Sequence, residues 1–360
     1  MSENRELLDE NTQEAEAPVT DEAEYDEEYY EEYTDEPYEK SRVGRVIGII
    51  LKVVACLVAF AVVFTIGAEV IAASEYTKII FNPQAFSKTE QSRQVLKGAL
   101  AEPAYVEWMG SVGERVTIKN SDGYELNGVY IEKYAITNTY VIIFHPYTAG
   151  VGDMARHARL FYEMDFNVLV VESRGHGDSK YTTNTLGYNE RYDVVDWVNF
   201  VADKDSDSDI FLFGLGSGGS TVLMASSLEM PANVKGIIAD SAYANLNELF
   251  KENVGELYNL PSFPTVEIAA GFIEKNMGFN PNEVDVIKEV QNSTLPILVV
   301  ISGSDNVVSE EQSEAIYDAC TVEGSDRLYV DNVYHCGALN GKPQKYEREI
   351  TRFILDNLDK

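Results

Sequence analysis

Apolar and polar residues are distributed unevenly between the beginning of the chain and the rest. Residues 1–42 follow neither a helical nor a strand period, and their repeated acidic side chains repel one another, so we expect a disordered acidic tail. The run from Val46 to Ala68 is apolar except for Lys52, and at ~1.5 Å per residue it is about 35 Å long. This length predicts one transmembrane helix within residues 43–73.

After this helix the pattern changes twice. Residues 74–107 should form a juxtamembrane helix and linker, with a helical stretch over residues 91–101 that ends at Pro103. From residue 108, short apolar runs typical of strands buried on both faces alternate with helical stretches. We therefore predict an α/β domain over residues 108–360, with a mostly parallel eight-stranded sheet and flanking helices. The predicted strands are 115–119, 125–131, 140–145, 167–172, 210–214, 234–240, 297–302 and 328–330, and the predicted helices are 154–164, 188–202, 220–227, 310–319 and 344–357.

Charge separates the tail from the domain. The chain of 360 residues has 60 acidic and 28 basic residues, a formal net charge of −32. Such an acidic chain is unsuited to binding nucleic acid, which requires clustered Lys and Arg. Its three cysteines exclude a scaffold held together by disulfides. The tail carries a large share of the charge, and nothing in it identifies a protein partner.

The basic residues beside the apolar run predict an orientation. Lys40, Arg42 and Arg45 precede the run, whereas Lys78 is the nearby basic residue after it. Cytoplasmic flanks carry the excess of Lys and Arg, so we expect a single-pass cell-membrane protein with a cytoplasmic N-terminus and an extracytoplasmic C-terminal domain. The long acidic leader argues against a cleaved signal peptide and favours a signal-anchor.

Four stretches, taken in order, carry a resemblance to a known family. They are Val141–Thr148, which covers the third strand and the loop after it, Glu172–Ser179, Gly187–Trp197 and Tyr334–Gly337. Together they resemble the α/β-hydrolase fold superfamily, of the bacterial kind related to serine aminopeptidases and acyl-ester hydrolases. The resemblance implies a hydrolase of ester or peptide-like acyl substrates that needs no cofactor. It also implies that the connection over residues 245–292 is a small helical cap, for which ordinary packing onto the sheet is the alternative.

The nucleophile position departs from the pattern of this family. The family motif, Gly-x-Ser-x-Gly, places a serine on a tight turn between a strand and a helix. Aligning Gly214 and Gly218 with the two motif glycines puts Gly216 where the serine belongs. A shift of one residue would make Ser217 the nucleophile, but the bulky Leu215 would then replace the first glycine. We favour the unshifted register, in which serine chemistry is lost.

The remaining catalytic positions are assigned by the same resemblance. In a working enzyme Ser217 would attack the acyl carbonyl, His335 would take its proton, and Asp305 would orient His335. The backbone amides of Tyr147 and Gly218 would face the oxyanion. Asp240, at the end of a predicted strand, is a substitute acid, while Pro146 replaces a glycine and has no amide proton to donate.

The other histidines and cysteines point to structural roles. We expect His145 and His176 to support their loops and His157 to lie on a helix surface. Because no two histidines stand at ligand spacing, we expect no metal site. Cys320 and Cys336 should lie at opposite ends of the sheet, too far apart for a disulfide.

Two functions remain open from the sequence. One is a membrane-anchored serine hydrolase of acyl substrates that uses Ser217 or another rescue residue. The other is a non-catalytic pseudoenzyme of the same fold that binds a small acyl or peptide-like ligand, or a partner, at the cell envelope. The fold resemblance cannot choose between them.

Overall fold

A computed structural model describes residues 41–89, 92, 102–133, 137–180 and 183–358. The tail predicted over residues 1–42 and the helix predicted over residues 91–101 lie almost wholly outside the described residues. The chain divides into two compact units, residues 1–59 and 60–360, and each is described by itself.

Helix α1 (Arg42–Ile80) contains the predicted membrane span and extends beyond it. It is long and apolar enough to cross a membrane. The part of α1 that belongs to the second unit exposes large apolar side chains, among them Phe64 (69% exposed) and Ile71 (66% exposed). The last turns of α1 differ, because Ala73, Tyr76 and Thr77 are buried against the folded domain. The last turns of α1 therefore belong to the core of the domain, whereas the earlier turns expose apolar side chains.

Eight strands form one sheet in the order β1-β2-β4-β3-β5-β6-β7-β8. The pairs β1–β2 and β2–β4 are antiparallel, whereas all pairs from β4 to β8 are parallel, so the predicted mostly parallel sheet is confirmed. Parallel strands covered on both faces must be apolar throughout, and β4 and β7 are buried at every residue. The strands are β1 (Glu114–Lys119), β2 (Glu125–Ile131), β3 (Thr139–Phe144), β4 (Asn167–Val171), β5 (Asp209–Leu215), β6 (Val234–Asp240), β7 (Ile297–Ser302) and β8 (Asp326–Val330).

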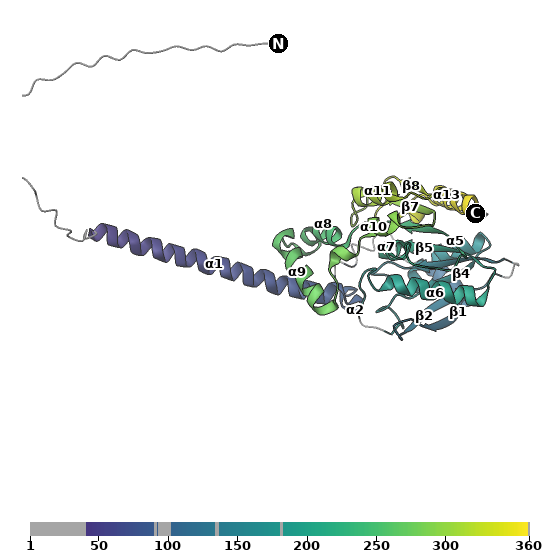
Figure 1. Ribbon diagram of the computed structural model, residues 1–360, viewed down its shortest axis with the longest axis horizontal. Coiled ribbons are helices and arrows are strands. Elements are labelled where there is room, and N and C mark those ends of the chain that lie inside the picture. The colour runs from purple at the N-terminus through teal and green to yellow at the C-terminus, as the bar shows by residue number, and fades with distance from the viewer. Residues whose placement is uncertain (1–40, 90–91, 93–101, 134–136, 181–182, 359–360) are drawn as a thin grey trace, which may run out of the picture. The chain divides into compact units, whose positions relative to one another are not determined.

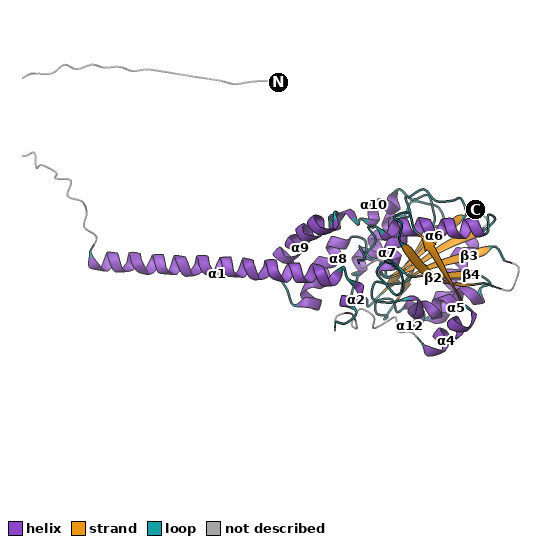
Figure 2. Ribbon diagram, turned by 90° about the horizontal axis from the view of Figure 1, so that it is seen from below, coloured by secondary structure: helices purple, strands orange, loops and turns teal. Residues whose placement is uncertain are grey.

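Helices cover both faces of the sheet (Figures 1 and 2). One apolar layer joins the sheet to α6 (Glu190–Lys204), α7 (Ser217–Met224), α10 (Val286–Gln291) and α11 (Glu310–Ala319). The other joins it to α4 (Pro103–Val112), α5 (Ala155–Glu163), α12 (Ala338–Gly341) and α13 (Pro343–Leu358). The shorter elements are α2 (Pro83–Phe86), η2 (Val151–Met154) and η3 (Pro281–Glu283).

Two long helices lie in the chain connection that leads from β6 to β7. They are α8 (Leu246–Tyr258) and α9 (Ser262–Met277), within the connection predicted to be a cap. The amide protons at the start of α8 are satisfied by the Asn245 side chain, which accepts bonds from Asn247 and Glu248. Phe250 and Val254 of α8 are buried in the same apolar layer as Tyr76 of α1. This layer links the cap helices to the end of α1.

The sequence did not indicate the helix that begins at Pro103. Pro103 is the first residue of α4, with Glu102 as the N-cap. Proline is well tolerated there, because the first amides of a helix have no acceptor within it. Met109 of α4 is buried in the apolar layer of α5.

Candidate active-site pocket

The turn between β5 and α7 has Gly216 at its apex. Gly216 has φ +57° and ψ −123°, a conformation that L side chains rarely adopt. The two flanking glycines are required by close packing, since a Cβ on Gly214 would overlap the Gly218 carbonyl and a Cβ on Gly218 would overlap the Phe144 carbonyl. The turn therefore keeps Gly214 and Gly218 as its two small residues, with Gly216 between them.

The apex of this turn faces His335. A Cβ built on Gly216 would lie 3.2 Å from Nε2 of His335, 3.1 Å from Sγ of Cys336 and 3.0 Å from Cβ of Pro146. The side chain that would point at the histidine is therefore absent, and Pro146 and Cys336 border the space where it would stand.

His335 is oriented by Asp305. Nδ1 of His335 lies 2.9 Å from Oδ2 and 3.1 Å from Oδ1 of Asp305, and both side chains are buried. Oδ1 also accepts the backbone amides of Val307 (2.8 Å) and Val308 (2.9 Å). Burial alone would lower the pKa of His335, but Asp305 and Cys336 outweigh it and hold that pKa well above its usual value. The pair leaves Nε2 directed at the turn.

Asp240, which the sequence offered as a substitute acid, makes its hydrogen bonds to groups other than His335. Its carboxylate accepts hydrogen bonds from the hydroxyls of Tyr346 and Ser241, each at 2.9 Å, and its backbone carbonyl accepts the Gly216 amide at 2.7 Å. Burial raises the pKa of Asp240 to about 6. The structure thus joins Asp305 to His335 and uses Asp240 to hold the turn.

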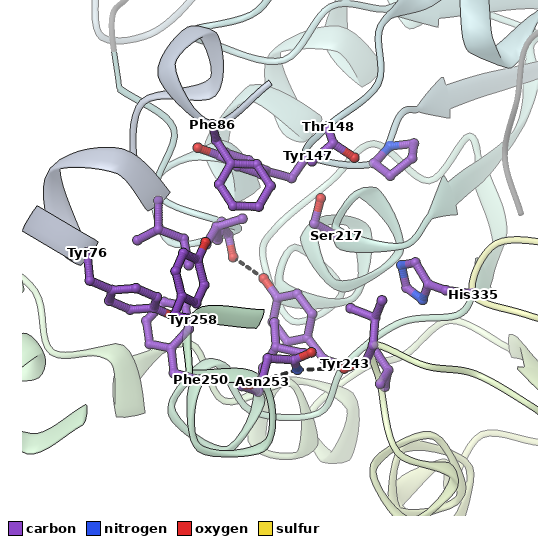
Figure 3. A pocket seen from close by; sticks show the side chains of 16 residues that line it. Tyr76, Phe86, Tyr147, Thr148, Ser217, Tyr243, Phe250, Asn253, Tyr258 and His335 are labelled. Carbon is purple, nitrogen blue, oxygen red and sulfur yellow. Dashed lines mark hydrogen bonds between the residues drawn. The ribbon is translucent and has the colours of Figure 1, made fainter. Parts of the chain in front are cut away.

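Ser217 is the first residue of α7 and lines the pocket beside the turn. Its hydroxyl points toward Tyr147 and Thr148 and away from His335 (Figure 3). Since Gly216 is at the apex, the amide that directly follows the apex is that of Ser217. Gly218, whose amide was predicted to face the oxyanion, is one residue further along.

Two histidines fix the loop that carries Pro146 and Tyr147. Nδ1 of His145 donates to the Pro146 carbonyl (2.8 Å), and its Nε2 accepts the amide of Ser173 (3.1 Å). His176 bonds through Nε2 to the Tyr147 carbonyl. Burial lowers the pKa of His145 to about 3, so it is neutral at pH 7. The loop-supporting interpretation agrees with these contacts.

The interpretation of His157 as a surface residue was wrong. His157 of α5 is buried, with its ring 5.2 Å from that of Phe213 and 6.3 Å from that of Tyr346. Neither ring nitrogen has a hydrogen-bond partner among the residues that the structure describes. The sequence pattern predicted an exposed histidine because imidazole is polar, but in the structure His157 occupies a position on the buried, apolar face of α5.

A buried ion pair holds the loop after β4. Nε of Arg174 donates to Oδ2 of Asp193 (2.7 Å), and Nη2 donates to Oδ1 (2.6 Å). Nη1 donates to Asp122 (3.0 Å), and Asn120 donates to Asp193 (2.7 Å). Arg174 and Asp193 come from two of the stretches that carry the family resemblance, so these stretches act structurally.

The pocket beside His335 contains about 640 Å³ of empty space, part of which is open to solvent. Its walls come from α8, the loop after β7, α2 and the last turns of α1. Tyr76 and Ile80 of α1 contribute to it, and Phe86 of α2 packs against Tyr147 with ring centroids 5.5 Å apart. The sequence did not indicate that α1 builds this wall, because the contacts join residues distant in the chain.

Comparisons with known proteins identify the fold. The family model described as serine aminopeptidase, S33, matches residues 136–271. A Pyrococcus furiosus esterase, Pf2001, superposes with a TM-score of 0.58 at 20% identity, over 70% of this chain and 94% of the esterase. This chain is an α/β-hydrolase fold protein. Est1E from Butyrivibrio proteoclasticus, solved with ferulic acid, has a TM-score of 0.55 at 20% identity over 68% of this α/β-hydrolase fold protein and 100% of Est1E.

Curated relatives are similar over most of their length. The uncharacterized protein YqkD of Bacillus subtilis is 25% identical over 244 residues, which is 67% of this chain and 79% of YqkD. The uncharacterized protein YfhR of Escherichia coli K12 is 22% identical over 254 residues, 68% of this chain and 82% of YfhR.

Proposed function

We propose that this α/β-hydrolase fold protein is a membrane-anchored pseudo-hydrolase that binds an acyl or peptide-like ligand beside His335 without serine-dependent hydrolysis. The observation that carries the proposal is Gly216 at the apex of the turn. The missing side chain is the one that would stand 3.2 Å from Nε2 of His335, so the histidine has no nucleophile to activate there.

The position of Ser217 supports the same proposal. A nucleophile must lie within hydrogen-bond reach of its base, and among the described residues no hydrogen bond joins Ser217 to His335. Moving Ser217 to the apex would place Leu215 where close packing now requires Gly214. His335, oriented by Asp305, then remains as part of the wall of the ligand pocket.

The anchor and its orientation are part of the proposal. α1 would cross the cell membrane once, and Arg42 and Arg45 at its start favour a cytoplasmic N-terminus. The α/β-hydrolase domain would then lie on the extracytoplasmic side, where it binds its ligand. The acidic composition supports a role that does not involve nucleic acid.

Turnover of acyl esters tests this function. We expect the purified full chain to hydrolyse p-nitrophenyl esters of short and long acids no faster than its Ser217→Ala variant does. Hydrolysis that is saturable and lost in Ser217→Ala would show that Ser217 acts as a nucleophile, and the pseudo-hydrolase proposal would fall.

A further inference from the structure

The pocket beside His335 is apolar but contains hydroxyls that lack hydrogen-bond partners. In the described part of the chain, the hydroxyls of Tyr147, Thr148 and Tyr258 are buried without a partner, and all three residues line this pocket. Tyr147 as a whole is only 9% exposed. A buried hydroxyl without a partner costs free energy, so a ligand that supplies hydrogen-bonding groups would recover it.

Among the described residues that line the pocket, His335 is the one whose side chain is basic or acidic. The other lining residues are aromatic, aliphatic or uncharged polar residues, with no Lys, Arg, Asp or Glu among them. His335 is itself paired with Asp305, so the pocket offers no unbalanced cation to a phosphate or carboxylate. Burying an unpaired anion there would be costly. The chemistry therefore suits a neutral molecule with an apolar chain and a few oxygen atoms.

The wall formed by α1 places the pocket close to the apolar surface of that helix. Tyr76 packs edge-on against Phe250 (5.8 Å) and Tyr258 (4.7 Å) of α8. Ile71, one turn earlier on α1, is 66% exposed and belongs to the predicted span. At ~1.5 Å per residue, Ile71 and Tyr76 are separated by about 8 Å along the helix axis.

The cap also meets α1 at the end of its apolar run. Thr265 of α9 donates a hydrogen bond to Glu69 (2.7 Å), which is the first charged residue after that run. Phe263, two residues before Thr265, is 76% exposed. An exposed Phe beside a membrane span is suited to enter the boundary between the lipid headgroups and the acyl chains. The cap and the pocket beneath it would then lie at the surface of the bilayer.

We propose that the pocket takes the acyl chain of a neutral single-chain lipid, such as a monoacylglycerol, directly from the membrane leaflet that α1 enters. Tyr76 and Ile80 guide the chain into the pocket. The hydroxyls of Tyr147, Thr148 and Tyr258 bind the ester and glycerol oxygens. This inference rests on the proposed function, because it names the ligand of the same pocket.

Photo-crosslinking in vesicles tests the inference. The full chain is reconstituted in phosphatidylcholine vesicles that contain a monoacylglycerol with a diazirine on its acyl chain, and crosslinked peptides are located by mass spectrometry. We expect crosslinks on α8 and on the loop after β7. Labelling confined to α1 residues before Ile71, with none in the pocket, would overturn the proposal.

Matched variants show whether crosslinking depends on the pocket. Leu249→Trp fills the pocket, whereas Leu355→Trp makes the same change at a side chain that is 63% exposed. We expect Leu249→Trp to reduce pocket crosslinking at least about tenfold and Leu355→Trp to leave it unchanged. Tyr147→Phe and Tyr258→Phe keep the shape and remove the hydroxyls, so each should weaken labelling about fivefold. Equal labelling in all four variants would contradict the proposal.

Further experiments test the identity of the ligand separately from the absence of hydrolysis. A lysophosphatidic acid analogue with the same photoactivatable chain should crosslink poorly, and equal labelling would refute the preference for a neutral lipid. Release of free fatty acid from the monoacylglycerol, if lost in Ser217→Ala, would refute the pseudo-hydrolase function and leave the lipid inference intact. Crosslinking by a water-soluble butyryl ester but not by the lipid would refute the lipid inference and leave the proposed function intact.

Discussion

A Cβ on Gly216 would stand 3.2 Å from Nε2 of His335, so the position that a nucleophile needs is formed by the backbone and contains no side chain. The other ring nitrogen of His335, Nδ1, lies 2.9 Å from Oδ2 of Asp305. In the proposed pseudo-hydrolase, Asp305 and His335 therefore stand beside Gly216, which has no side chain to act as the nucleophile. The proposed ligand would bind in the pocket that His335 borders.

Restoring the missing side chain should restore chemistry. We expect Gly216→Ser combined with Cys336→Ala to hydrolyse p-nitrophenyl butyrate at least about 100-fold faster than the parent chain, because the serine would meet an oriented base. Cys336→Ala removes the Sγ that would lie 3.1 Å from the new Cβ. The strained backbone at the apex costs about 1–3 kcal/mol, so the melting temperature should fall moderately.

Adding His335→Gln to this pair of changes is the matched control. It should abolish the gained activity, since proton transfer from the serine requires His335. A folded Gly216→Ser/Cys336→Ala variant with no gain would show that the turn and the histidine are not positioned for nucleophilic catalysis.

His157 should make the fold sensitive to acid. Burial lowers the pKa of His157 to about 3, so below pH 6.5 the unfolded chain binds a proton that the folded chain does not. Stability is therefore lost as the pH falls from about 6.5 toward 3, by about 2 kcal/mol at pH 5. His157→Phe should reduce the difference between the melting temperatures at pH 7 and pH 5. An unchanged difference would contradict the assignment of His157 as a buried neutral imidazole.

The ion pair of Arg174 should be essential for stability. Arg174→Ala leaves Asp193 buried without its counter-charge, and we expect a loss of about 3–5 kcal/mol in the free energy of unfolding. The matched control is Arg115→Ala, because Arg115 and its partner Asp178 are both exposed. That change should cost less than about 1 kcal/mol. Similar losses in both variants, measured by thermal unfolding, would argue against a special role for the buried pair.

The proposed orientation can be tested on intact cells. If the N-terminus is cytoplasmic, an added protease should remove the domain from about residue 75 to 360 and leave the tail and span with the cells. Immunoblots against tags at the two ends would report both fragments. Full protection of the C-terminal tag in intact cells, with cleavage after lysis, would contradict this orientation.

Helices and strands were predictable from the sequence where nearby residues determine where they begin and end. The limits of β6, β7 and α11 were predicted to the residue. The apolar residues at the ends of β6 and β7 are followed by Asp240 and Ser302, and the Ser309 side chain caps α11. The register of the glycine turn also follows from sterics, since Gly214 and Gly218 have no space for a side chain. The start of α4 was missed because proline is compatible both with the end of one helix and with the beginning of another.

Long-range contacts account for what the sequence did not indicate. The wall that Tyr76 contributes depends on packing against Phe250 and Tyr258, which lie far along the chain. The burial of His157 depends on Phe213 and Tyr346 from two other elements. No local periodicity records such contacts.

Labelling with a fluorophosphonate probe tests the central claim most directly. The purified full chain should show no mass increase that depends on Ser217, because the Ser217 hydroxyl points away from His335. The Gly216→Ser/Cys336→Ala variant should gain one adduct. Stoichiometric labelling of the unaltered chain that disappears in Ser217→Ala would contradict the account.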